Sequence, residues 1–266
     1  MSLKKTNIGI WLINLPDDTS RRQKMEFQLK ELGLEANIFK AIDGKKYENE
    51  LSIKACPKAY ARNMGSNLLP GKLGVYASHI SVWEALLESS HEAALVLEDD
   101  VVFHNDFTLA LEIALENADL WDLVKLSKIR AKFPIKQAEL GPYTLNAYIG
   151  PFTGNACYLI HKSVAKHILR GLWPQTRALD HELNRFFVHN YRQLGLEPWA
   201  SHPDDHGIST ITGMNFSFVK KFKWYKRLPY YCLKAANYFR RAFWLWKNDM
   251  LWPNVNKRNG KETGCL

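Results

Sequence analysis

The sequence contains no apolar run that approaches the roughly 20 residues of a membrane-spanning helix. The apolar run at residues 8–15 is short, contains Asn14 and leads to Pro16 rather than to a small-residue cleavage site, so we expect a first strand and not a signal peptide. Cysteine is scarce as well: the four cysteines are scattered, which excludes a small disulfide scaffold and the paired spacing of a zinc site. These absences favour a globular protein of a reducing, cytoplasmic compartment.

Acidic residues are nearly missing from the end of the chain. Residues 220–266 contain 12 Lys and Arg against 2 Asp and Glu, whereas residues 1–219 contain 24 against 25, so the formal net charge of +9 belongs to the tail. A chain of 266 residues of which 46% are hydrophobic can bury a full core. We therefore expect a neutral main domain over residues 1–219 and a basic segment over residues 220–266.

The tail is predicted to contain an amphipathic helix. On a helical wheel at about 100° per residue, one half of the circumference holds Tyr231, Ala235, Tyr238, Phe239, Ala242, Phe243, Leu245 and Trp246. The other half holds Lys234, Asn237, Arg240, Arg241, Lys247 and Asn248, and only Trp244 is out of place. Basic residues opposite aromatic ones are typical of a helix that lies on an anionic membrane surface. The alternative is a terminal helix that packs on the protein's own core, and nucleic-acid binding is disfavoured because the basic excess avoids the main domain.

The remaining patterns indicate an α/β sheet. A strand, a helix and a second strand within about 35 residues suggest a parallel crossover unit. Strands are expected at residues 8–13, 38–41, 95–98, 120–126 and 156–160, and helices at residues 20–32, 74–87, 163–172 and 179–190. Residues 45–70 show no clear period and are expected to be a long excursion over the sheet. Together with residues 128–149, they are expected to be variable loops that build the acceptor pocket.

Residues 95–100 read LVLEDD, a strand that ends in three carboxylates. In a strand, Glu98 and Asp100 fall on one face, where they could converge on a divalent cation, while Asp99 points the other way. Mg²⁺ and Mn²⁺ bind few carboxylates together with water and phosphate oxygens, so the expected ligand is a nucleotide diphosphate rather than a bare ion. The alternative is a turn or a cap for a helix near Asp106, but a turn gains nothing from three acids in a row.

Several segments follow one another between about residues 6 and 212: INLPDDTSRRQKMEFQLKELGL, KAIDG, GKLGVYASHISVWEALLE, ALVLEDDV, WDLVKL, TGNACYLIHKSVAKHIL and ALDHEL. Their order and spacing resemble glycosyltransferase family 25, the lipopolysaccharide and lipooligosaccharide sugar transferases that are related to the collagen galactosyltransferases. The Ser-His pair before a helix, together with EDD after the next strand, is the most specific part of this resemblance. The tail from residue 220 onward matches nothing firmly.

The resemblance implies a GT-A-like fold, a Rossmann-like mixed sheet with flanking helices that binds a nucleotide sugar, with residues 1–219 as the catalytic domain. It implies a UDP-hexose donor, UDP-galactose or UDP-glucose, transfer with inversion at the anomeric carbon, and a lipid-linked oligosaccharide acceptor. Glu98, Asp99 and Asp100 stand where the family has its DxD-type motif, so Mn²⁺ or Mg²⁺ is the implied cofactor. With the basic tail, the expected location is peripheral, on the inner leaflet of the bacterial cytoplasmic membrane.

The resemblance also implies a general base and a further metal ligand. Asp180 and Glu182, in ALDHEL, are the expected bases, with Asp180 first because it matches the family's recurrent Asp. Asp180 could equally cap the helix that follows. The metal is expected to be held by Asp100 with help from Glu98 and a late histidine, His206 or His202.

Donor contacts are expected in three further places. Asn14 and Leu15, at the end of the first strand, are expected to lie against the nucleotide, and Arg21 or Arg22 is expected to pair with a phosphate. Ser78 and His79, before the acidic strand, are expected to contact the donor sugar. Asp99 is expected to hydrogen-bond the ribose or the donor sugar. Surface charge for the two arginines and a buried, hydrogen-bonded role for His79 are the structural alternatives.

Two other functions compete with a glycosyltransferase. A metal-dependent phosphohydrolase would use the same carboxylates, but such enzymes need more ligands from several strands, and late in the sequence the further tight acid cluster is Asp204 with Asp205. A non-catalytic membrane-binding protein would rely on the tail alone. Metal-dependent binding of UDP separates the three functions.

Overall fold

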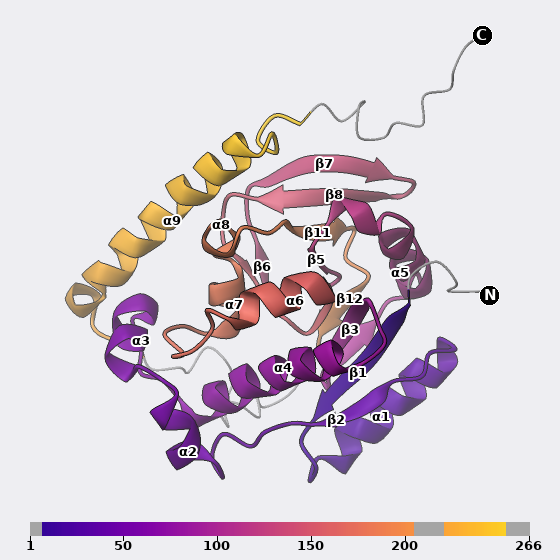
Figure 1. Ribbon diagram of the computed structural model, residues 1–266, viewed down its shortest axis with the longest axis horizontal. Helices are drawn as coiled ribbons and strands as arrows, with labels where there is room; N and C mark the ends of the chain where they lie inside the picture. The colour runs from indigo at the N-terminus through magenta and orange to yellow at the C-terminus, as the bar shows by residue number, and fades with distance from the viewer. Residues whose placement is uncertain (1–6, 205–220, 254–266) are drawn as a thin grey trace.

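The computed structural model describes residues 7–204 and 221–253. Eight strands form one large sheet: β1 (Ile8–Asn14), β2 (Asn37–Lys40), β3 (Ala93–Glu98), β5 (Leu123–Lys125), β7 (Pro134–Leu140), β8 (Tyr143–Tyr148), β10 (Cys157–His161) and β11 (Gln193–Glu197) (Figure 1). Their order across the sheet is β2-β1-β3-β10-β5-β11-β8-β7. The sheet is mixed, because β1 runs parallel to β2 and β3, while β10 runs antiparallel to both of its neighbours.

Two small antiparallel pairs accompany this sheet. They are β4 (Val101–Phe103) with β12 (Ser201–Pro203), and β6 (Arg130–Ala131) with β9 (Phe152–Thr153). The helices are α1 (Thr19–Glu31), α2 (Glu48–Ile53), α3 (Pro57–Met64), α4 (Pro70–Glu88), α5 (Phe107–Glu116), α6 (Lys162–Leu169), α7 (Leu179–Leu183), α8 (Phe186–His189) and α9 (Leu228–Lys247). Helices α4 and α6 pack against each other over β1, β3 and β10 (Figure 1). Among the residues described, no helix is long and apolar enough to cross a membrane.

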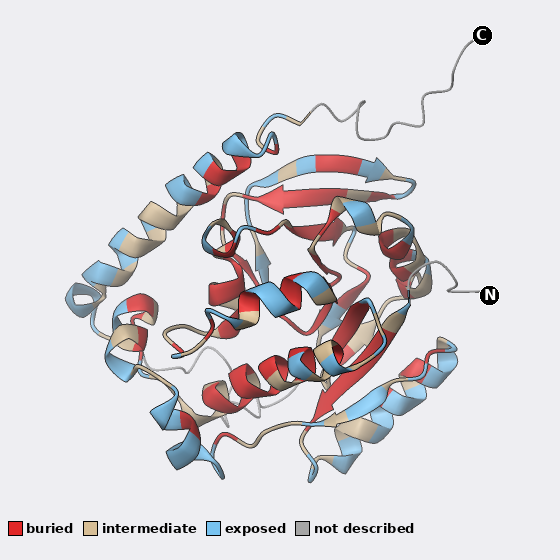
Figure 2. Cartoon of the chain, in the orientation of Figure 1, coloured by how far each residue is buried: buried red, intermediate tan, exposed pale blue. Residues whose placement is uncertain are grey.

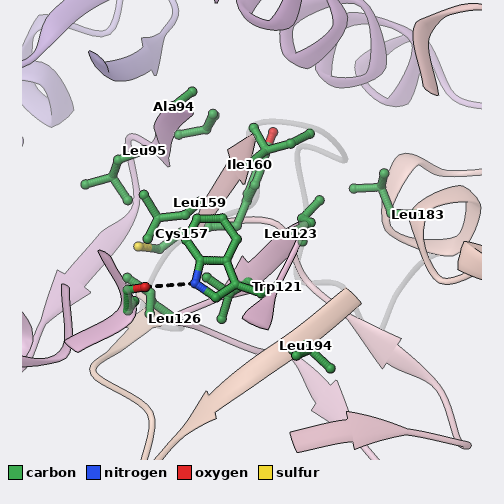
Figure 3. Packing of buried hydrophobic residues seen from close by; sticks show 14 of the residues in the cluster. Ala94, Leu95, Trp121, Leu123, Leu126, Cys157, Leu159, Ile160, Leu183 and Leu194 are labelled. Carbon is green, nitrogen blue, oxygen red and sulfur yellow. Dashed lines mark hydrogen bonds between the residues drawn. The ribbon is translucent and has the colours of Figure 1, made fainter. Parts of the chain in front are cut away.

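The core lies on the central strands. All five apolar residues of β3 before Glu98 are fully buried, as are those of β5 and β10 (Figure 2). Figure 3 shows how the side chains of these strands meet around Trp121, whose indole N–H donates to the Ala114 carbonyl oxygen at 2.8 Å. Trp244, Leu245 and Met250 from the tail belong to the same hydrophobic cluster. The last described part of the chain therefore shares the core of the sheet.

The first crossover unit was predicted correctly, and its local signals explain why. The Asp18 carboxylate accepts a hydrogen bond from the backbone N–H of Arg21 and caps α1. Gly33, with a φ of 67°, ends the same helix in the left-handed conformation that favours glycine. Helix α4 begins at Pro70, four residues before the expected start, because proline is suited to the first helical turn.

Two segments that we expected to be loops contain regular structure. Residues 45–70 include α2 and α3, which are six and eight residues long and too short to show a clear period. Residues 128–149 include the hairpin β7–β8, whose turn contains Gly141 at a φ of 62°. Five of the six residues of β8 are buried, so the alternation that identifies a strand is missing. The helix expected over residues 179–190 is two short helices, α7 and α8.

The tail helix α9 packs along α3 and α8 on the outside of the molecule (Figure 1). Its contact stripe is Arg241, Trp244 and Leu245, all buried, which explains why Trp244 did not fit the wheel. Phe239, Phe243 and Trp246 point away from the protein, with 77%, 61% and 54% of their surface exposed. The helix therefore packs on the core along one stripe and leaves its aromatic face open to solvent.

Candidate active site

The acidic motif lies where β3 ends at the centre of the sheet. Glu98 is the last residue of the strand, and Asp99 and Asp100 form the turn into β4. The backbone N–H of Glu98 donates to the carbonyl oxygen of Ala156, so the loop before β10 lies beside the motif. The backbone N–H of Asp204 donates to the carbonyl oxygen of Asp100 at 2.7 Å. The expected metal ligand His206 lies two residues further on, outside the described residues.

Glu98 is fixed by a buried chain of hydrogen bonds. The His79 Nε2 atom lies 3.0 Å from a Glu98 carboxylate oxygen, and His79 Nδ1 lies 2.9 Å from the Tyr158 hydroxyl. The Trp83 indole N–H also donates to that hydroxyl, at 2.9 Å. Because the indole can only donate, the tyrosine proton is free to point at Nδ1. His79 then carries its proton on Nε2 and donates it to Glu98, which makes His79 a residue that orients the carboxylate.

Asp99 turns away from Glu98 and meets residues from the first crossover unit. The Asn14 side chain donates to one of its oxygens at 2.8 Å, and Arg21 donates to the other at 3.1 Å. Burial raises the pKa of Asp99, and the hydrogen bonds and charge of these two partners offset part of that effect. Three residues predicted to contact the donor are thus brought together at the end of β1.

Asp100 is the carboxylate in the least favourable surroundings. Its Oδ1 atom is buried, and no residue that the structure describes donates a hydrogen bond to it. Burial, followed by repulsion from Glu98 and Asp99, raises the pKa of Asp100 to about 7. The carboxylate oxygens of Glu98 and Asp100 suit a hard divalent cation, which would neutralise both carboxylates and take its other ligands from water and phosphate.

No cluster of three or more His, Cys, Asp or Glu side chains that could enclose a metal occurs among the residues the structure describes. His202, the alternative third ligand, forms a hydrogen bond through Nδ1 with His104 Nε2 at 2.8 Å. Of the predicted metal ligands, Glu98 and Asp100 are the ones that the structure places at the end of β3.

Asp180 is the second residue of α7, whose N-cap is Ala178, and its carboxylate is held by two backbone N–H groups. Its Oδ1 accepts from the N–H of His181 at 2.8 Å, and its Oδ2 accepts from the N–H of Gly154 at 3.4 Å. Burial acts to raise the pKa of Asp180, but His181, the Lys125 ammonium and these hydrogen bonds outweigh it, so the pKa lies below its ordinary value. The carboxylate is therefore ionised at neutral pH, which is the form that can accept a proton.

The loop over residues 153–156 connects the two acidic sites. Gly154 donates to Asp180, while Ala156 accepts from Glu98. Underneath lies Lys125, fully buried, whose ammonium donates to the carbonyl oxygens of Gly154 at 2.7 Å and Phe152 at 3.3 Å. Burial lowers the pKa of Lys125 to about 8, and the charges of Asp180 and Glu98 act against that decrease. Sequence reasoning missed Lys125, although a lysine inside the apolar strand of WDLVKL was a signal.

Glu182 has a different environment from Asp180. Its carboxylate pairs with Arg185 at 2.7 Å, with Arg177 at 3.2 Å and with His189 at 3.0 Å. Burial acts to raise its pKa, but these partners prevail and lower the pKa to about 2. With both oxygens occupied, Glu182 joins α7 to α8 and leaves Asp180 as the more accessible base.

The other predicted donor contacts have local partners. The Ser78 hydroxyl donates to the Gly74 carbonyl oxygen and accepts from the backbone N–H of Ile42, so it ties α4 to the segment after β2. The Leu15 carbonyl oxygen accepts from the N–H of Asp18 in the turn before α1. Arg22 pairs with Glu26 one turn along α1, at 3.7 Å. Of the two arginines, the structure brings Arg21 to the acidic motif.

An eight-stranded mixed sheet with flanking helices, and carboxylates at the end of a central strand, is consistent with a Rossmann-like glycosyltransferase fold. A family model described as glycosyltransferase family 25 (LPS biosynthesis protein) matches residues 7–181. The chain therefore belongs to glycosyltransferase family 25, as its motifs predicted.

Two curated relatives and one solved structure describe the similarity further. A glycosyltransferase 25 family member of Aedes aegypti is 27% identical over 73% of this chain and 34% of its own length. Procollagen galactosyltransferase 1-A of Xenopus laevis is 33% identical over 73% of this chain and 32% of its own length. The chain thus spans about a third of these relatives. The crystal structure of A197 from STIV is 12% identical, with a TM-score of 0.39, over 71% of this chain and 81% of that chain.

Proposed function

We propose that this chain is a glycosyltransferase that moves a hexose, galactose or glucose, from a UDP-sugar to a sugar of a lipooligosaccharide or lipopolysaccharide acceptor. The observation that carries the proposal is the pair of acidic sites at the two ends of the 153–156 loop. Glu98 and Asp100 suit a cation and a diphosphate, whereas the ionised Asp180 suits the hydroxyl that attacks. Membership of glycosyltransferase family 25 supports the same assignment.

The donor nucleotide is proposed to bind at the carboxyl ends of β1 and β3, in a fold of the GT-A type. Open α/β sheets bind ligands at this edge. Asp99, fixed by Asn14 and Arg21, is available to accept hydrogen bonds from the ribose or the donor sugar. Arg21 adds a positive charge where the diphosphate would lie.

The reaction is proposed to need Mn²⁺ or Mg²⁺, held by Asp100 with help from Glu98. When bound, such an ion acts as a Lewis acid that neutralises the charge on the departing UDP. The residues of the chain prepare this site: His79 orients Glu98, and the buried Oδ1 of Asp100 offers an unused acceptor. His206 remains the proposed third ligand.

Inversion requires one displacement, in which the acceptor oxygen bonds to the anomeric carbon as the bond to the β-phosphate breaks. Asp180 is proposed to take the proton of the acceptor hydroxyl. The backbone N–H groups of His181 and Gly154 hold its carboxylate in place, and Lys125 stabilises its negative charge. Glu182, held by two arginines and a histidine, is the less suitable base.

The enzyme is proposed to act at the inner leaflet of the bacterial cytoplasmic membrane, where a lipid-linked acceptor is available. The support is the exposed aromatic face of α9, made by Phe239, Phe243 and Trp246. Arg240 and Lys247, both exposed, lie on the same helix and can approach anionic headgroups. Arg241 is buried and takes no part in that contact.

The proposal is tested by titrating UDP into the full chain with and without Mn²⁺, followed by a transfer assay with UDP-galactose or UDP-glucose and lipooligosaccharide. A glycosyltransferase binds UDP much more tightly with metal and consumes the donor faster when the acceptor is added. A phosphohydrolase would instead release phosphate whether or not an acceptor is present. A non-catalytic membrane-binding protein would bind UDP weakly with or without metal.

A further inference from the structure

A cavity of about 280 Å³ lies between α9, α3 and the start of α7, apart from the acidic motif at the end of β3. It opens beside His181, the residue that follows the proposed base, and beside Thr153, the residue before Gly154. Among the described residues that line it, none is Asp or Glu, and seven are basic: Lys72, Arg130, Arg177, Lys221, Arg227, Lys234 and Arg241. The cavity is therefore strongly cationic.

Most of this positive charge has no carboxylate partner in the described part of the chain. Arg177 pairs with Glu182, but Arg241, only 4% exposed, donates to the carbonyl oxygens of Ile149 and Asn184. The guanidinium of Arg227 stacks on two tyrosine rings, and its Nε has no hydrogen-bond partner among the described residues. Burial lowers the pKa of Arg241 to about 10. Buried cations are costly unless an anion accompanies them.

The cavity also offers hydrogen-bond acceptors. The Oδ1 atoms of Asn63 and Asn184 are buried and accept no hydrogen bond from a described residue. The Asn63 amide N–H donates to the Thr176 carbonyl oxygen, so its oxygen is the atom left for a ligand. Cations suit phosphate or carboxylate oxygens, whereas amide oxygens suit hydroxyl groups. A ligand that carries both is an anionic sugar.

The position of the cavity favours the acceptor over the donor. None of the residues proposed to hold the donor, Asn14, Arg21 or the Glu98–Asp100 motif, lines it. The two segments that the sequence predicted to build the acceptor pocket, residues 45–70 and 128–149, both contribute to its lining, through Ser66 and Arg130 among others. Resting on the proposed function, we infer that this cavity binds a phosphate or carboxylate group of the acceptor glycan and so presents the acceptor hydroxyl to Asp180.

The experiment uses the full chain in phosphate-free buffer and measures binding of inorganic phosphate, glucose 6-phosphate, glucuronate and glucose by calorimetry. The test variant is Arg130→Gln with Lys234→Gln, two cavity residues whose side chains form no hydrogen bond or ion pair with another described residue. The control is Lys30→Gln with Lys166→Gln, which removes the same charge from exposed helix positions outside the cavity.

Wild type and control should bind the sugar phosphate or the glucuronate and ignore glucose, and the preferred anion identifies the acceptor group. The test variant should lose about tenfold or more in that affinity, the usual scale for a lost charge-assisted hydrogen bond, with UDP affinity unchanged. If the test and control variants bind the anion equally well, or if the wild type binds no anion, the inference that this cavity is an anion site is overturned.

Displacement of the anion by UDP also overturns the inference, because the cavity would then belong to the donor. In the transfer assay the test variant should raise the KM for lipooligosaccharide about tenfold, with kcat and the KM for donor nearly unchanged. If the wild type binds the anion but shows no UDP binding or transfer, the proposed function fails while the anion site stands, and the acceptor role is overturned.

Discussion

Asp100 and Asp180 are both partly buried carboxylates, yet their surroundings shift their pKa values in opposite directions. Burial, together with repulsion from Glu98 and Asp99, raises the pKa of Asp100 to about 7. Asp180 faces His181, Lys125 and two N–H groups, so its pKa falls below the ordinary value despite burial. A pair of acids with separated pKa values is the arrangement expected of a site with two chemical roles. A bound cation would favour the ionised form of Asp100, whereas Asp180 is ionised at neutral pH without one.

Replacing Asp100 with Asn should reduce transfer by about 100-fold or more, because a metal ligand at the departing phosphate is lost. Metal-dependent UDP binding should weaken in parallel, which calorimetry measures. The variant should remain folded, since Oδ1 of Asp100 accepts no hydrogen bond from a described residue. Glu116→Gln, at an exposed position on α5, is the control. Near wild-type turnover at saturating Mn²⁺ would remove Asp100 from the proposed metal site.

Replacing Asp180 with Asn should lower turnover by about 100-fold or more, the usual scale for a lost general base. UDP and metal binding should change little. Because the pKa of Asp180 is lowered, its protonation should not limit the wild-type rate between about pH 5 and pH 8. This whole range lies about one unit or more above the ordinary pKa of an aspartate. Steady-state kinetics against pH check both statements. A variant that transfers normally, or one that no longer binds UDP, would show that Asp180 is not the base.

Ionised Glu182 should increase the free energy of unfolding at neutral pH. Its pKa is lowered from 4.5 to about 2, so its contribution to folding is present above the unfolded-state pKa and is lost as the pH falls toward 2. The decrease corresponds to about 3 kcal/mol. Glu182→Gln should therefore lower the free energy of unfolding at pH 7, and the difference from wild type should shrink below about pH 4.5. Urea unfolding at several pH values measures this difference, which would stay constant with pH if the pairs contributed nothing.

How far the site could be predicted depends on how local its signals are. Asp99, Asn14 and Arg21 meet because parallel strands place their carboxyl ends at one edge, which the sequence pattern implied. Lys125 was not predicted, because β10 separates β5 from β3 in the sheet and no periodic pattern specifies that order. The sequence offered Asp180 and Glu182 together. The resemblance placed Asp180 first, and the ion pairs of Glu182 give a physical reason for that order.

At the scale of elements, predictability follows length and signal. The first crossover unit carries a cap, a glycine stop and clear strands, and it was predicted correctly. The β7–β8 hairpin was missed, because β8 is buried on both faces and shows no alternation. Helix α9 was predicted as a helix, but its wheel could not tell which face meets the protein. The structure shows that Arg241, from the polar half, is buried with Trp244 and Leu245.

The open face of α9 gives a prediction for the helix. Phe239→Gln with Phe243→Gln should weaken binding to anionic vesicles about tenfold or more, since each phenyl group buried in the interface contributes on the order of 1 to 2 kcal/mol. Phe27→Gln, at an exposed position on α1, is the matched control. Sedimentation with vesicles measures both variants. Binding that neither salt nor the double substitution reduces would mean that α9 does not hold the protein on a membrane.

At the scale of the whole molecule, charge and packing divide the chain differently. The surplus of positive charge begins at about residue 220, which is why we expected a separate segment there. In the packing, Trp244, Leu245 and Met250 join the core of the sheet, and the Arg241 guanidinium donates to the carbonyl oxygens of Ile149 and Asn184. A count of charged residues shows where charge lies along the sequence, but it does not show which side chains of the same segment pack into the core.

Removing residues 222–266 should therefore destabilise the body. Burial of Trp244, Leu245 and Met250 would be lost together, and a single large buried side chain is worth about 2 to 5 kcal/mol. The truncated chain should unfold at a clearly lower temperature, by about 10 °C or more for a domain of this size, as calorimetry or circular dichroism measures. The double phenylalanine variant should keep the wild-type melting temperature, because its side chains are exposed. If the truncated chain has the same melting temperature as the full chain, α9 does not stabilise the main domain, and residues 220–266 form an independent segment as their charge suggested.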